Sequence, residues 1–246
     1  MDTTRTSRWG PTVLSLLLFG IAFGYLEAAV VSYLRALHEP ARQRFYPGRP
    51  PGELFPLLTI EQAQAAGPEQ PKILIIEIGR EAATIVMLAA IALAVADNAG
   101  QWAAAFAIAF GTWDIAFYAF LKLLLDWPAS LFTWDILFLI PIPWVGPVLA
   151  PVLVSASMIA AGMWHLRREA IGERMQLSIL QWVGIVLGAF VIVTSFTMDH
   201  RNIMAGGMPR PFNWTIFGWG MAIGVLSYAS AAMVRRAQRE QAAAAR

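Results

Sequence analysis

Cysteine is absent from the 246-residue sequence, and charged residues are scarce. The absence of cysteine excludes disulfide bonds, thiolate zinc sites, cysteine-ligated iron–sulfur clusters and thiol nucleophiles. Asp, Glu, Lys and Arg make up 14% of the chain, against about 25% in a typical soluble domain. Because the net charge is only +2, we expect no nucleic-acid partner. P-loop, GxGxxG, HExxH and GxSxG motifs are missing as well.

Hydrophobic residues, by contrast, make up 58% of the chain, and its mean hydropathy is +0.57. A helix needs about 20 apolar residues to cross a hydrocarbon core of about 30 Å. Six segments reach this length, so the sequence predicts an all-α, polytopic membrane bundle that forms a single integral membrane domain. The predicted spans are 11–36, 72–96, 101–126, 145–166, 175–198 and 214–234.

Two connecting segments have an unusual composition. Residues 38–70 are rich in proline but also contain apolar side chains such as Phe55 and Leu57, so we expect a loop that packs onto the helices. Residues 129–141 are apolar and lie between Pro128 and Pro141. This stretch is too short to span a bilayer, and we predict a re-entrant or interfacial half-helix on the outer face.

The arginine distribution predicts the orientation of the bundle. Sixteen of the 18 basic residues are arginines, which together with frequent alanine is typical of a bacterial chain rich in GC codons. The positive-inside rule favours cytoplasmic N- and C-termini, and a bacterial inner membrane is the expected location. The predicted cytoplasmic arginines are Arg5, Arg8, Arg167, Arg168, Arg174, Arg235, Arg236, Arg239 and Arg246, against Arg35, Arg42, Arg44, Arg49, Arg201 and Arg210 outside.

Ionisable residues inside the predicted spans gather on single helix faces. They are costly at membrane depth and usually face the bundle interior. At 1.5 Å per residue, all of them fall in the outer half of the bilayer or near its midplane. We therefore predict one polar site, to which the half-helix adds Asp135. Its members are Glu27, Glu77, Arg80, Glu81, Asp114, Tyr118, Lys122 and Asp135.

The charges of this predicted site do not balance. Four carboxyl groups in the spans face only two basic side chains, which leaves two negative charges unpaired before Asp135 is counted. A desolvated carboxylate without a partner takes up a proton or binds a cation. The candidate ligands for a divalent cation are Glu27, Glu77, Glu81 and Asp114. The alternative is a structural network, in which Arg80 bridges Glu27 and Glu77, Lys122 pairs with Asp114 and the remaining acid is neutral.

Histidine ligation of a haem or metal is the less favoured interpretation. His38 and His200 both fall at the predicted outer ends of spans, which allows a bis-histidine site. However, Glu39 and Asp199 adjoin them, and loop histidines of this kind are usually solvated or locally hydrogen-bonded.

Three functions remain open at this point. The chain is a subunit or small carrier that binds protons or a cation, a membrane-embedded enzyme acting on a lipid-soluble substrate, or a structural accessory subunit of a larger complex. Six spans without a visible repeat are few for a carrier, so that reading requires a homo-oligomer or a partner membrane subunit in addition to the lipid bilayer.

Overall fold

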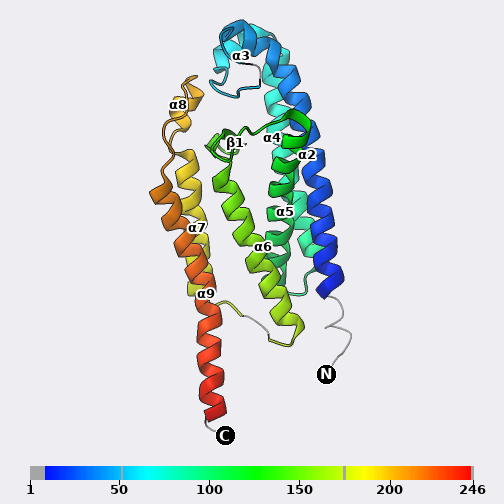
Figure 1. Cartoon of the computed structure of the whole chain (residues 1–246), viewed down its shortest axis with the longest axis vertical. Helices are drawn as coiled ribbons and strands as arrows, with labels where there is room; N and C mark the ends of the chain where they lie inside the picture. Colours follow the sequence, from blue (N-terminus) through cyan, green and yellow to red (C-terminus); the bar gives the residue numbers. More distant parts are fainter. Residues whose placement is uncertain (1–8, 51, 174–175, 245–246) are drawn as a thin grey trace.

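The computed structural model describes residues 9–50, 52–173 and 176–244, with side chains described up to residue 231. Long helices run along the length of the molecule, and α2 begins at the same end as α9 terminates (Figure 1). The elements are α2 (Trp9–Phe45), α3 (Ile60–Ala66), α4 (Glu69–Val95), α5 (Ala99–Leu125), β1 (Trp134–Phe138), β2 (Trp144–Pro147), α6 (Leu149–Ala170), α7 (Ile179–Thr197), α8 (His200–Met204) and α9 (Trp214–Ala244).

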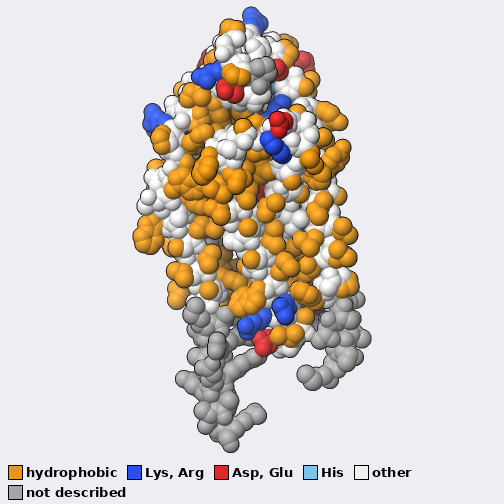
Figure 2. All heavy atoms as spheres, in the orientation of Figure 1, with side chains coloured by type: hydrophobic (Ala, Val, Ile, Leu, Met, Phe, Trp, Pro, Cys, Tyr) orange, Lys and Arg blue, Asp and Glu red, His pale blue; other side chains and the backbone are white. Residues whose placement is uncertain are grey.

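The protein is an integral membrane protein by the length and composition of its helices. Within the described residues, five helices are long and apolar enough to cross a bilayer, namely Trp9–Phe45, Glu69–Val95, Ala99–Leu125, Leu149–Ala170 and Ile179–Met204. Figure 2 shows apolar side chains over the middle of the molecule and charged side chains near its two ends. The sixth predicted span lies in α9, which is helical but is not one of these five, so a sixth crossing stays a prediction.

Glycines bring the helices into close contact. A Cβ atom added at Gly24 of α2 would lie 2.7 Å from the Cβ of Ala116 on α5. Between α5 and α6, a Cβ at Gly111 would lie 2.5 Å from the carbonyl oxygen of Ser155. A Cβ at Gly188 of α7 would lie 2.6 Å from a backbone nitrogen of α9. Small residues therefore set the spacing of the α2–α5, α5–α6 and α7–α9 pairs.

The predicted half-helix over 129–141 is wrong, and the fold is accordingly not purely α-helical. Strands β1 and β2 form an antiparallel hairpin between α5 and α6, in which Asp135 pairs with Gly146. Isoleucine, phenylalanine, tryptophan and valine favour extended backbone, and Pro141 and Pro143 between the strands cannot donate helix hydrogen bonds. The hairpin satisfies its backbone groups by pairing the strands instead.

The predicted outer loop, residues 38–70, is partly helical. Helix α2 continues through Pro40 to Phe45, and Arg42 is buried there, donating to Glu39 at 3.2 Å and to the carbonyl of Pro50 at 2.7 Å. Thr59 and Gln62 form a capping box that starts α3. The loop also packs onto the hairpin and α8, because one buried apolar residue from each of the three segments belongs to the same cluster. The buried members are Phe55, Val145 and Ile203.

We refer below to the part of the molecule that carries α3, α8 and the hairpin as the α3 end. It lies opposite the point where α2 begins and α6 ends (Figure 1). Helix α6 stands between the α7–α9 pair and the group formed by α2, α4 and α5 (Figure 1). Folded segments therefore cover the helices at the α3 end, and the polar side chains of the spans lie beneath these segments.

Candidate functional site

Arg80 of α4 joins two glutamates from different helices. Its Nη1 donates to Glu27 of α2, and its Nε donates to Glu77, one turn earlier on α4, at 2.8 Å. Nη2 donates to the second oxygen of Glu77, so this pair is bidentate. The side chains are 21%, 9% and 14% exposed for Arg80, Glu27 and Glu77. The arrangement matches the Arg80 part of the structural alternative drawn from the sequence, and it ties α4 to α2 through charge.

Glu81 is buried beside this ion-pair network but makes a different contact. Its Oε2 accepts a hydrogen bond of 2.8 Å from the backbone N–H of Leu139, immediately after β1. Its electrostatic neighbours are Glu77, Arg80 and Glu27. The carboxyl group of Glu81 therefore fastens the hairpin to α4, and its direct partner is uncharged.

Asp135 of β1 is 4% exposed and faces α5. The hydroxyl of Tyr118 donates to its Oδ2 at 2.9 Å, and Arg35 of α2 is its electrostatic counterpart. Burial raises the pKa of Asp135 to about 6, while Arg35 and the hydrogen bond from Tyr118 act in the opposite direction. The guanidinium carbon of Arg35 lies 3.9 Å from the ring centroid of Trp127, so the arginine is held by stacking.

Asp114 lies deeper along α5, one turn before Tyr118. Its Oδ2 accepts a hydrogen bond of 2.8 Å from the hydroxyl of Ser155 on α6. The described residues provide no cation in salt-bridge contact with Asp114. Asp135 acts on it electrostatically, which adds a second negative group rather than a compensating one.

The predicted site residues thus form two neighbouring groups. One contains Glu27, Glu77, Arg80 and Glu81, and the other contains Asp114, Tyr118 and Asp135 together with Arg35 and Ser155. The hairpin touches both, since β1 carries Asp135 and the residue that binds Glu81 follows it.

Lys122 has its partner outside these two groups. Its Nζ pairs with Asp126 at 2.6 Å, and its side chain is 50% exposed. Lys122 lies eight residues beyond Asp114, which rotates it by roughly 80° around the helix. Asp126, in the left-handed conformation that ends α5, then brings a carboxylate within reach of it.

Arg35 and Ser155 are the residues that sequence reasoning underrated. Arg35 was counted only among the outer arginines; it follows Glu27 by eight residues, which turns it by roughly 80° around α2, so periodicity did not group the two. Ser155 was not among the predicted site residues, and only the contact between α5 and α6 places its hydroxyl on Asp114. In both cases the partner lies on another element, which periodicity along one helix does not report.

Neither the metal site nor the haem site is assembled here. Among the described residues, no three His, Cys, Asp or Glu side chains are grouped closely enough to hold a metal ion. Arg80 already bridges two of the four candidate ligands. His38 pairs through Nδ1 with Gln70 at 2.6 Å, and Nδ1 of His200 lies 2.8 Å from the carbonyl oxygen of Thr197.

Comparison of the chain with known protein families, with curated proteins and with solved structures finds no match.

Proposed function

We propose that this protein is a small multi-pass membrane subunit or carrier that binds protons, or a cation in their place, on carboxyl groups near its α3 end. The observation that carries the proposal is that three of these carboxyl groups have only uncharged hydrogen-bond donors. Glu81 accepts from a backbone N–H, Asp114 from Ser155 and Asp135 from Tyr118.

Charge counting supports this reading. Five carboxyl groups face two guanidinium groups in the described part of the site, because Lys122 is engaged by Asp126. If all five were ionised, three negative charges would remain in a region from which the apolar helices exclude water. Such an excess is relieved by protonation or by a bound cation, and intramembrane acids with this property mark ion and proton pathways.

We further propose six spans, with α9 as the sixth, in a bacterial inner membrane with both termini in the cytoplasm. Arg167 and Arg168 at the end of α6, opposite the α3 end, support this orientation. Arg5, Arg8, Arg174 and Arg246, which also contributed to it, lie outside the described residues. In this orientation the carboxyl groups lie in the outer half of the membrane, and a homo-oligomer or partner subunit would complete the pathway.

A structural accessory role is the second candidate, and the network around Arg80 favours it. A buried arginine shared by glutamates of two helices fixes how those helices pack without any exchange of ions. The membrane-enzyme alternative loses support from the same contacts, because Arg80 is no longer available to hold an anionic substrate group.

The test compares Glu81→Gln, Asp114→Asn and a matched control, Asp126→Asn, in lipid nanodiscs. Asp126 has a 92% exposed side chain, and asparagine tolerates its left-handed backbone, so the control makes the same chemical change outside the site. Infrared difference spectra recorded across a pH titration report carboxyl groups that gain or lose a proton.

We expect a carboxyl band in the wild type and in Asp126→Asn that is lost in Asp114→Asn or Glu81→Gln, with helix content by circular dichroism unchanged. Parallel calorimetric titrations with Na⁺ and Mg²⁺ identify a bound cation. The accessory role is supported instead if no band changes with pH, no cation binds, and the substitutions alter only stability or assembly.

A further inference from the structure

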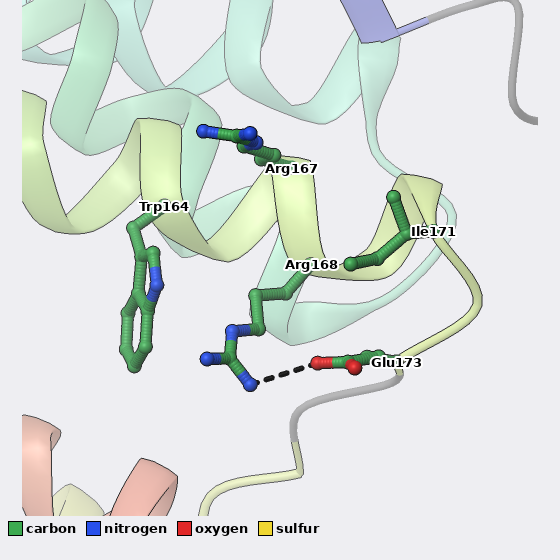
Figure 3. A pocket seen from close by; sticks show the side chains of 5 residues that line it. All are labelled: Trp164, Arg167, Arg168, Ile171 and Glu173. Carbon is green, nitrogen blue, oxygen red and sulfur yellow. Dashed lines mark hydrogen bonds and ion pairs between the residues drawn. The ribbon is translucent and has the colours of Figure 1, made fainter.

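A cavity of about 250 Å³ lies at the far end of the molecule from the carboxyl groups. It is lined by residues from the last turns of α6 and the segment that follows, namely Trp164, Arg167, Arg168, Ile171 and Glu173. Figure 3 shows Arg168 extended alongside Trp164 toward Glu173, while Arg167 leaves the helix in another direction. The lining therefore combines two basic side chains, one acid and two large apolar groups.

Arg168 is held in place at this cavity rather than free to move in solvent. Its guanidinium carbon lies 4.9 Å from the ring centroid of Trp164, and its Nη1 donates to Glu173 at 2.7 Å. Trp164 in turn packs edge-on against Tyr228 of α9 at 5.7 Å. A guanidinium has five N–H donors, and the hydrogen bond to Glu173 uses one of them, so others remain for a ligand in the cavity that Arg168 lines.

The charge of the lining is matched to a monoanion. Two arginines and one glutamate give a net charge of +1, and Arg167 is exposed without an ion-pair partner among the described residues. Arginine binds phosphate oxygens in a bidentate manner. Ile171, which is 65% exposed, and Trp164 add an apolar wall beside these donors.

The depth of the cavity indicates where such an anion comes from. Arg167 and Arg168 occupy the last turn of a helix long and apolar enough to cross the bilayer, so they lie at the level of the lipid headgroups. Basic pockets between membrane helices at this level bind anionic headgroups. We infer that this cavity, beside the last turns of α6, binds the phosphate of an anionic phospholipid whose glycerol and acyl carbons contact Trp164 and Ile171.

The experiment is native mass spectrometry of the full-length protein released from nanodiscs that contain phosphatidylglycerol and phosphatidylcholine. We expect preferential retention of phosphatidylglycerol by the wild type. Arg168→Gln should weaken it by about tenfold, as expected for loss of a charged hydrogen bond. Arg167→Gln removes no ion pair among the described residues and so spares the fold, and it should weaken retention by about fivefold.

Arg201→Gln is the matched control, because Arg201 is an exposed arginine of α8 at the opposite end of the molecule. It should leave retention unchanged. Equal retention of both lipids, or equal effects of Arg167→Gln and Arg201→Gln, would overturn the inference. Competition with inorganic phosphate separates the sources: if phosphate binds and no lipid preference exists, the lipid assignment is refuted. None of these readouts depends on the carboxyl groups of the proposed function.

Discussion

Replacing Arg80 with glutamine should destabilise the protein more than removing an exposed cation from the same helix. Arg80 is the cation that pairs with both Glu27 and Glu77, and its removal leaves two carboxylates that are 9% and 14% exposed. Breaking a buried ion pair by removing one partner costs about 3–5 kcal/mol. Because 21% of the Arg80 side chain is exposed, we expect a loss at the lower end, about 3 kcal/mol.

The measurement is equilibrium unfolding in mixed micelles, with Lys72→Gln as the matched control on the same helix. Lys72 pairs with Glu69 at the same three-residue spacing, but these side chains are 63% and 71% exposed. Exposed pairs contribute about 0–1 kcal/mol, so Lys72→Gln should have almost no effect. The contrast isolates burial, since both substitutions remove one cation from α4.

A neutral replacement of the whole network gives the complementary result. Arg80→Met combined with Glu27→Gln and Glu77→Gln leaves no unpaired charge, and its stability should fall within about 1 kcal/mol of the wild type. The reasoning is refuted if Arg80→Gln costs no more than Lys72→Gln, or if the triple substitution is as damaging as the single one.

Two further predictions concern packing and the second group of polar residues. Gly24→Ala should destabilise the protein by about 1–3 kcal/mol in thermal unfolding, because its Cβ would meet Ala116. The control is Gly79→Ala, which has open space around it and should stabilise α4 by up to about 1 kcal/mol. Equal effects of the two substitutions would contradict the α2–α5 contact. Tyr118→Phe should cost about 1–3 kcal/mol by leaving buried Asp135 without its hydroxyl donor, and unchanged stability would refute that bond.

The carboxyl site shows how far periodicity along the chain reaches. The glutamates and Arg80 of α4 fall on one face by their three- and four-residue spacing, and the structure keeps them together. Arg35, the charged neighbour of Asp135, could not be found from the spacing of residues along one helix. Helix α2 packs against α5 with Gly24 next to Ala116. This relative position of the two helices, their offset, places Arg35 over Trp127 and close enough to Asp135 to interact with its charge. The offset is a property of two helices, and neither sequence segment contains it.

The sequence by itself determined the apolar helices, the small residues at their contacts and the faces that carry acids. These features depend on hydropathy and on a 3.6-residue period, which act within one segment. Only the tertiary structure decided that residues 134–147 form a hairpin that Glu81 holds and that Ser155 reaches Asp114. Each of these depends on groups distant in sequence, whose hydrogen bonds and charges are satisfied only once the helices have packed.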